Sequence, residues 1–178
     1  SELEKIVEEN RRLVKEHNER LKRILDELRE LAKRHEDRSR KAMKENEELV
    51  RTVLELMKRD GPDERVLREL RKRSKDIVDD LRRHLKELSD TARKLIEEIR
   101  KSLEELERRT KKLADDLPET EKVRKIREES KRLHETNRRR VEKIEEEIRR
   151  LLKRLEDTNR DIERRSKKLH EDLEREAR

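Results

Sequence analysis

The chain of 178 residues has no Phe, Tyr, Trp or Cys, a single Gly and only two Pro. Without cysteine there is no disulfide, no thiolate metal ligand and no thiol nucleophile, and the redox compartment is left open. With one glycine there is no glycine-rich phosphate-binding loop. No apolar run is long enough to span a bilayer or to form the core of a signal peptide. We therefore expect a soluble chain with no readable targeting signal.

Charged residues make up 58% of the sequence and hydrophobic residues 28%. A low apolar content can indicate disorder, but disordered chains lack periodicity and are rich in Pro and Gly. Lys and Arg number 55 against 48 Asp and Glu, and the two signs alternate along the chain, as in "IEEEIRRLLKRLED". This composition is typical of long helices and coiled coils. The mixed charge favours a solvated surface over a binding face of one sign.

The helix-breaking residues occur at two places, "KRDGPDERV" and "DDLPETEKV". Gly61 can adopt the left-handed conformation that ends a helix, and Pro62 suits the first turn of the next one. Pro118 marks the second break, with Glu119 and Glu121 at the start of the third helix. The expected helices span 2–59, 62–116 and 119–177, each about 80 Å long. Short connections make consecutive helices antiparallel.

Apolar residues recur every three or four positions within each of these segments. The first stripe contains Leu3, Ile6, Asn10, Leu13, His17, Leu21, Ile24, Leu28, Leu31, His35, Ser39, Ala42, Asn46, Leu49, Val53 and Leu56. The third contains Val123, Ile126, Ser130, Leu133, Asn137, Val141, Ile144, Ile148, Leu151, Leu155, Thr158, Ile162, Ser166, Leu169 and Leu173. A period of about 3.53 in the first stripe indicates nearly straight helices with weak left-handed supercoiling.

The stripes are narrow, which suits the seam of a coiled coil with three or four helices. The sequence therefore predicts an all-α fold. Residues 1–178 should form a single domain, an antiparallel up-down-up three-helix bundle of coiled-coil type with long, nearly straight helices.

Polar residues interrupt the stripes, and hairpin geometry predicts which of them meet. The numbers of facing residues should add to about 120 around the first loop and about 236 around the second. The expected layers are Asn10 with Thr110 and Ser130; His17 with Ser102, near His134 and Asn137; and Asn46 with Ser74, near Thr158 and Asn159. A middle layer brings His35 and Ser39 towards His84 and Ser89, where the third helix offers only Leu151, Leu152 and Leu155.

All of these polar residues are neutral, short and able both to donate and to accept hydrogen bonds. An unpaired buried polar group costs about 1–3 kcal/mol, so such layers would penalise a shifted register. We interpret them as buried polar networks that specify helix register. The candidate residues are Asn10, His17, His35, Ser39, Asn46, Ser74, His84, Ser102, Thr110, Ser130, Asn137 and Asn159. No catalytic residue, cofactor or metal ligand is expected.

Near-equal helices, the loops "RDGPDE" and "DLPETE", the absence of aromatic residues and the polar layers "N…T…S" and "N…S…N" occur together over the whole chain. In these features the sequence resembles de novo designed parametric helical bundles with buried hydrogen-bond networks. The resemblance implies a protein with no natural host, substrate or enzyme activity. It does not say whether the chain is a monomeric bundle, a hairpin oligomer, one half of a heterodimer or a switchable cage.

The five histidines are the remaining candidates for chemistry. Zinc needs three or four ligands, and no His-x-x-x-His or Glu-x-x-His motif occurs, so network or surface placement is favoured. A buried neutral His destabilises a fold when it must become charged. If His17, His35 and His84 are buried, we expect the bundle to loosen near pH 5.

Other functions find little support in the sequence. Ser39 lies one turn after His35, but no positioned acid or oxyanion hole accompanies them, so no catalysis is expected. Acidic residues follow the basic clusters "NRRRVEK", "ERRTKKL" and "ERRSKKL" within a turn, and we expect no specific nucleic-acid partner. A membrane-surface role would need aromatic residues or a broad apolar face. Pairs such as Glu145 with Arg149 are interpreted as ordinary surface ion pairs.

The sequence thus predicts a designed structural protein or scaffold that is monomeric and requires no partner. The alternative is a helical interaction module that accepts a further helix in its groove, from a designed partner or from another copy of the chain. The missing polar partner on the third helix in the middle layer favours this alternative slightly.

Overall fold

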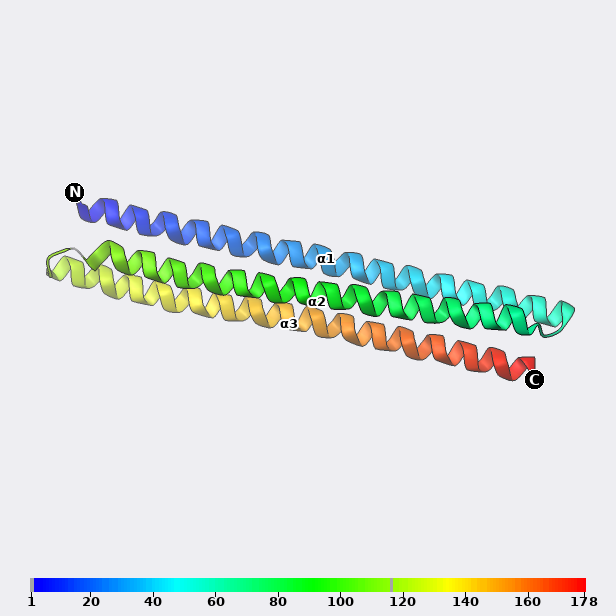
Figure 1. The fold of residues 1–178 in the computed structure, drawn as a ribbon. Helices are drawn as coiled ribbons and strands as arrows, with labels where there is room; N and C mark the ends of the chain where they lie inside the picture. Colours follow the sequence, from blue (N-terminus) through cyan, green and yellow to red (C-terminus); the bar gives the residue numbers. More distant parts are fainter. Residues whose placement is uncertain (1, 116) are drawn as a thin grey trace. The chain divides into compact units, whose positions relative to one another are not determined.

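The computed structural model describes residues 2–115 and 117–178. These residues form three helices, α1 (Glu2–Asp60), α2 (Glu64–Asp115) and α3 (Glu121–Ala177), and contain no strand (Figure 1). The predicted all-α fold class with three helices is confirmed.

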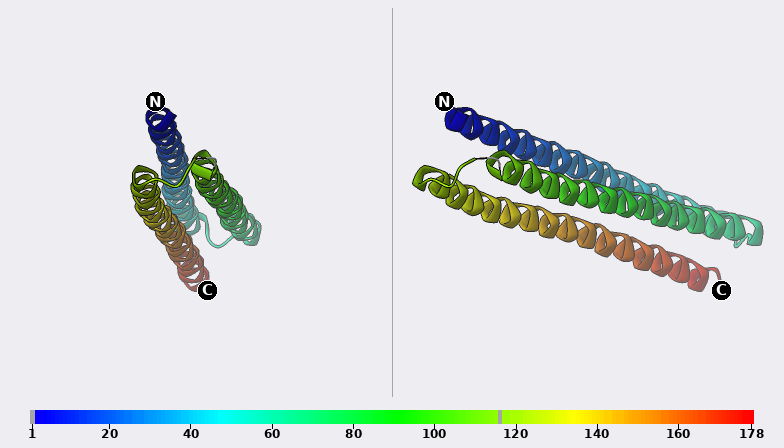
Figure 2. Two further views of the ribbon diagram at one scale, coloured as in Figure 1. Left: turned by 90° about the vertical axis from the view of Figure 1, so that its left-hand side faces the viewer. Right: turned by 60° about the vertical axis from the view of Figure 1, so that its left-hand side comes forward.

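The chain divides into two compact units, and each contains a segment of every helix. Unit 1 comprises the described residues of Ser1–Arg29 and Thr91–Arg150, and unit 2 comprises Glu30–Asp90 and Leu151–Arg178. Within each unit the α1 and α3 segments run in one direction and the α2 segment in the other (Figure 1). The left view of Figure 2 looks onto the end of unit 1, where the three segments stand at the corners of a triangle.

Gly61 ends α1 in the left-handed conformation, with φ of 85°. Its N–H donates to the carbonyl of Met57 at 2.9 Å, which is the single bond of the left-handed helix cap. α2 begins at Glu64 and not at residue 62 as predicted, because Asp63 caps it. Asp63 Oδ1 accepts from the N–H of Arg65 at 2.9 Å, and such a cap keeps non-helical dihedrals. Pro62 therefore lies before the helix.

Thr120 caps α3, which begins at Glu121 and not at residue 119. Its Oγ1 accepts from the N–H of Val123 at 3.3 Å, and its carbonyl accepts from the N–H of Arg124 at 3.0 Å. The predicted end of the second helix, residue 116, lies outside the described residues, and the described α2 ends at Asp115. Figures 1 and 2 show that α3 starts beyond the end of α2.

The buried face of α1 follows a longer period than the sequence stripe suggested. Its buried residues from Leu13 onward are Leu13, His17, Leu21, Ile24, Leu28, Ala32, His35, Ser39, Met43, Asn46, Val50, Val53 and Met57. They repeat about every 11 residues, or about 3.67 per turn, a spacing that does not favour a left-handed supercoil. The expectation of a 3.53 period is therefore wrong for α1.

As a result, four apolar positions in the second half of the α1 stripe move by one residue, while its polar positions and Val53 stay buried. Leu31, Ala42 and Leu49 are half-buried, and Leu56 is 40% exposed. The residues that follow them are buried instead: Ala32, Met43, Val50 and Met57. Each site offers two consecutive apolar side chains, so only packing against α2 and α3 decides which one faces the core.

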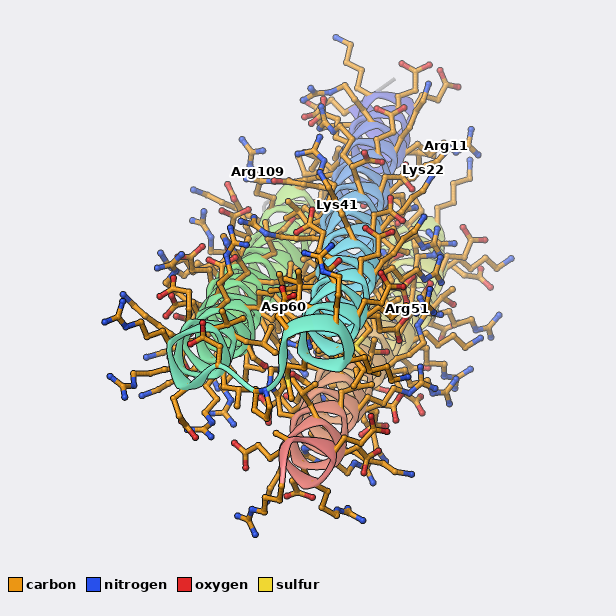
Figure 3. All side chains as sticks on the ribbon, turned by 90° about the vertical axis from the view of Figure 1, so that its right-hand side faces the viewer. Arg11, Lys22, Lys41, Arg51, Asp60 and Arg109 are labelled. Carbon is orange, nitrogen blue, oxygen red and sulfur yellow. The ribbon has the colours of Figure 1, made fainter. Side chains whose placement is uncertain are left out.

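Side chains from all three helices form the core of each unit. In unit 1, Leu21, Ile99 and Ile148 are at most 1% exposed. In unit 2 one cluster contains Val50, Val53, Met57, Leu67, Leu70 and Leu173. Burying one such aliphatic side chain contributes about 1.5–3 kcal/mol. Figure 3 shows charged side chains projecting outward from the helices, among them Arg11 and Arg51.

We predict that Gly61→Ala lowers the free energy of unfolding by about 1 kcal/mol, because an L side chain is strained at this positive φ. A Cβ here would meet no atom within 4 Å, so the backbone alone accounts for the loss. The measurement is the urea midpoint. Gly61→Asn is the matched control and should lose less, since Asn tolerates this conformation. An Ala variant as stable as the parent would contradict the assignment.

Candidate functional site

The first polar cluster, the Asn159 cluster, lies in unit 2 and joins all three helices. Asn159 Oδ1 is 3.1 Å from His35 Nε2 and 3.3 Å from Ser39 Oγ. Asn159 Nδ2 donates to the carbonyl of Leu81 at 3.2 Å. Because an amide oxygen only accepts, His35 Nε2 carries the hydrogen of the neutral ring. Asn159 is 4% exposed, and its side chain connects α1 to α2.

The middle layer therefore has a polar partner on α3, and the expectation that α3 offers only leucines there is wrong. His84, expected in this layer, is half-buried and lies beside carboxylates of its own helix, with Nε2 3.4 Å from Asp80 and Nδ1 3.6 Å from Glu87. Ser89 is half-buried and does not join the cluster.

The second cluster, the Ser166 cluster, also lies in unit 2. Asn46 Nδ2 donates to Ser166 Oγ at 2.9 Å, and Ser74 Oγ lies 2.6 Å from the same oxygen. All three residues are buried. The α3 member is thus Ser166, not the expected Thr158 or Asn159. The Thr158 hydroxyl donates instead to the carbonyl of Arg154 in its own helix, at 2.9 Å.

In unit 1 the His17 ring contacts α2, with Nδ1 2.8 Å from Ser102 Oγ. Both residues are buried. His17 Nε2 is also buried and has no hydrogen-bond partner. Asn137 on α3 is 1% exposed, and its Nδ2 likewise has no partner. Burial lowers the pKa of His17, and the positive charges of Arg140 and Arg20 lower it further.

The His134 cluster consists of Thr110, Ser130 and His134, in the part of unit 1 near the second loop. The Thr110 hydroxyl donates to the carbonyl of Leu106 at 2.9 Å, so its oxygen accepts from His134 Nε2, 2.7 Å away. Ser130 Oγ lies 3.3 Å from the same nitrogen. His134 was expected beside His17 and Ser102, and that expectation is wrong. Burial lowers the pKa of His134.

Asn10, expected with Thr110 and Ser130, lines a groove of about 570 Å³ together with the three residues of the His134 cluster. The same groove contains Ile6 and Ile126. Asn10 Oδ1 is buried without a hydrogen-bond partner. Since water does not reach this oxygen, a ligand in the groove would not reach it either.

The partners on α3 were predicted wrongly for one reason. The register predicted for the second hairpin differs from the observed one by one helical turn. The two loop sums imply that level residues of α1 and α3 are about 116 apart in sequence. The observed separation is 120 for both Ser39–Asn159 and Asn46–Ser166. α3 begins beyond the end of α2, so the hairpin is not symmetric about Pro118.

Sequence reasoning missed an ion pair between α2 and α3 in unit 1 in which the carboxylate is buried and the arginine is partly exposed. Glu145 is 3% exposed, and its two oxygens meet Arg100 Nε at 2.7 Å and Nη2 at 2.9 Å. The hydrogen bond to Glu145 raises the pKa of Arg100. Arg149 is also 3.5 Å away, but describing Glu145 as an ordinary surface partner of Arg149 is wrong. Its sequence signal was its place next to the apolar stripe residue Ile144.

Ion pairs at the edges of the core connect the helices within each unit. Arg138 meets Glu107 in unit 1 at 2.7 Å, and Arg82 meets Glu163 in unit 2 at 2.5 Å. The hydrogen bonds from these arginines lower the pKa of Glu107 and of Glu163. These pairs follow the same register as the buried clusters.

The arrangement offers little for catalysis or metal binding. The Ser39 hydroxyl donates to the main-chain carbonyl of His35 at 2.8 Å and not to its ring, so the histidine does not activate it. Within residues 2–115 and 117–178, no three His, Cys, Asp or Glu side chains are grouped so as to hold a metal ion. None of the described helices has an apolar stretch long enough to cross a membrane.

No protein-family model matches the chain, and no curated protein sequence matches it. A solved structure described as a computationally designed three helix bundle is similar, with a TM-score of 0.51 and 15% identity over 99% of this chain and 93% of that chain. At this identity the likeness shows the three-helix fold alone.

We predict that Asn159→Ala lowers the free energy of unfolding by at least about 2 kcal/mol, since it leaves the His35 N–H and the Leu81 carbonyl without their partner. Chemical denaturation measures the loss. The neighbouring Thr158→Ala is the control and should change stability by less than about 0.5 kcal/mol. Equal effects of the two changes would show that the Asn159 bonds do not matter.

A second prediction concerns the Arg100–Glu145 ion pair. Arg100→Met should cost about 2 kcal/mol because it leaves the buried Glu145 carboxylate with only the longer contact to Arg149, whereas the double replacement of Arg100 and Glu145 by Met should recover most of that loss. A double-mutant cycle of denaturation midpoints gives the coupling. The exposed Arg150–Glu146 pair is the control, and Arg150→Met should cost less than about 0.5 kcal/mol. A double variant no better than Arg100→Met would contradict this account.

Proposed function

We propose that this chain is a de novo designed structural protein, a scaffold with no natural biochemical activity, whose buried polar clusters specify the register of its helices. The observation that carries the proposal is the Ser166 cluster, in which one hydroxyl on α3 is bonded to side chains of both α1 and α2. A polar group held on two sides inside the core is used for packing specificity and is not presented to a ligand.

The remaining polar clusters support the same proposal. The Asn159 cluster pairs its side chains with one another and with the Leu81 carbonyl, and in the His134 cluster the Thr110 hydroxyl links α2 to His134 of α3. The sequence regularity and the likeness in fold to a computationally designed three helix bundle are consistent with a designed origin. Idealised helices with short capped loops are the usual means of obtaining a stable designed scaffold.

The alternative, an interaction module with a groove for a further helix, was left open because the narrow stripes suit four helices as well as three. The absence of a polar partner on the third helix for His35 and Ser39 favoured it slightly, and Asn159 is that partner. Leu56 is the single large hydrophobic residue that is clearly exposed among the described residues, and one such residue is not an open apolar seam.

The proposal includes one domain rather than two. α1, α2 and α3 each pass without interruption from one unit into the other. Helices that are continuous across the boundary favour joint unfolding over independent unfolding. A scaffold of this kind needs no partner.

Light scattering over a hundredfold range of protein concentration is the first test, with the expected mass of 22.0 kDa at every concentration. A constant monomer mass supports a scaffold complete in one chain. A mass that rises with concentration would instead favour the interaction module, because an apolar seam would then be satisfied by a second copy. Asn46→Leu provides a useful comparison, since loss of a polar layer should relax register and promote association.

A further inference from the structure

His17 is the most isolated titratable group in the core of unit 1. Its side chain is 4% exposed and its Nδ1 contacts Ser102, while Nε2 is buried and has no partner. A neutral imidazole has one donor and one acceptor nitrogen, but a protonated imidazole has two donors. Protonation would therefore place a charge and at least one unpaired N–H where water does not reach, which is costly.

No free carboxylate faces His17 from any helix packed against it. On its own helix it has Arg20, and on α3 it has Arg140. The adjoining groove between α1 and α2 also contains Glu16, Glu105, Arg23 and Arg109. Glu16 already pairs with Arg12 at 2.9 Å, and Glu105 lies 4.0 Å from Arg109. The surroundings of His17 thus disfavour its charged form.

His35 in unit 2 is buried to the same degree but is placed differently. Its Nε2 donates to Asn159 Oδ1, an acceptor that remains in place when the ring is protonated. Of the charged and titratable groups around it, Glu36 raises its pKa, while Arg38 and His84 of α2 lower it, and the hydrogen bond to Asn159 opposes the effect of burial. Burial is the larger effect and the pKa of His35 is still lowered, but the opposing hydrogen bond and the acidic neighbour that partly offset burial at His35 have no counterpart at His17.

The other histidines also have an acidic neighbour. His134 in unit 1 has Glu107 beside it, together with Arg138. In unit 2, His170 has Glu174 and Arg71, and His84 has Asp80 and Glu87. Among the five, His17 alone combines near-complete burial with charge effects that all lower its pKa.

We propose that the His17–Ser102 contact is an acid-sensitive latch in unit 1, whose protonation separates α1 from α2 there while the Asn159 cluster still holds unit 2 closed. The direction follows from linkage. A histidine whose folded pKa lies below the unfolded value of 6.5 stabilises the fold fully above pH 6.5. That contribution is lost as the pH falls from 6.5 through the folded pKa.

Hydrogen exchange followed by mass spectrometry on the full chain tests the latch at pH 7.5, 6.5, 5.5 and 4.5, after correction for the intrinsic exchange rate. We expect the opening constant of peptides covering 13–21 and 98–106 to rise by as much as about tenfold per pH unit below 6.5. Peptides covering 35–46 and 155–166 should change much less. Equal loosening of the two units, or no loosening, would overturn the proposal.

His17→Gln removes the titration and retains a polar side chain, so the rise in unit 1 should disappear. His35→Gln is the matched control and should leave that rise intact. His17→Leu is a second non-titrating variant in case the first does not fold at pH 7.5, which circular dichroism checks. A rise in unit 1 that persists in a folded non-titrating His17 variant would show that another group is responsible.

Discussion

The register of α3 against α1 decides which polar side chains meet in the core. In unit 2 the separation of 120 residues brings Ser39 to Asn159 and Asn46 to Ser166. In unit 1, Arg29 and Glu147 form a pair and are 118 residues apart. This separation agrees with the same register, because two long side chains can bridge a difference of two residues. The hydrogen bonds and ion pairs between α1 and α3 described above require this alignment, because a shift of one turn exceeds the reach of a hydroxyl or an amide.

The two units differ in how completely their buried polar groups are hydrogen-bonded. In unit 2 the Asn159 and Ser166 clusters satisfy most of their donors and acceptors within the protein, although Asn46 Oδ1 is buried without a partner. In unit 1 the buried atoms without a partner include Asn10 Oδ1, His17 Nε2 and Asn137 Nδ2. A partly satisfied network costs more than an apolar layer of the same shape, so the polar residues of unit 1 weigh against its stability. Local opening starts where such costs are concentrated, so unit 1 should open more readily than unit 2.

Local sequence signals predicted the helices well because they depend on single residues. Gly61 ended α1, and the two proline-containing segments marked both connections. The exact helix starts were missed because Asp63 and Thr120 form caps that no rule about proline anticipates. The register at the second loop was also missed. A loop fixes register through its backbone path, and sequence alone does not show that α3 begins beyond the end of α2.

The α2 partner of His17 follows from the first loop, whose midpoint lies near Gly61, and so the contact with Ser102 was within reach of the sequence. The α3 members of the clusters could not be predicted in this way. Because the predicted register was wrong by one turn, leucines were expected where Asn159 lies, and Thr158 where Ser166 lies. Glu145 was missed for another reason. A carboxylate beside an apolar stripe looks like a flanking surface residue, and only the position of Arg100 on α2 decides that it is enclosed and paired.

The two polar clusters of unit 2 are spaced by one heptad. In α1 the residues Ser39 and Asn46 are seven apart, and so are Asn159 and Ser166 in α3. A slip of α3 by one heptad would preserve the apolar pattern. It would bring Ser166 to the level of Ser39 but Leu173 to the level of Asn46, or in the other direction Asn159 to Asn46 but Leu152 to Ser39.

Either slip therefore keeps one polar layer and leaves the other facing a leucine. Each buried group that loses its partner costs about 1–3 kcal/mol, and the abandoned layer contains at least two. That penalty is a large part of a typical net stability of about 5–15 kcal/mol. A single polar layer would also leave two groups without partners in this slip, because in the pair one of the two layers re-forms. Polar residues spaced by one heptad thus still penalise, through the layer that is lost, the slip that an apolar heptad pattern tolerates best.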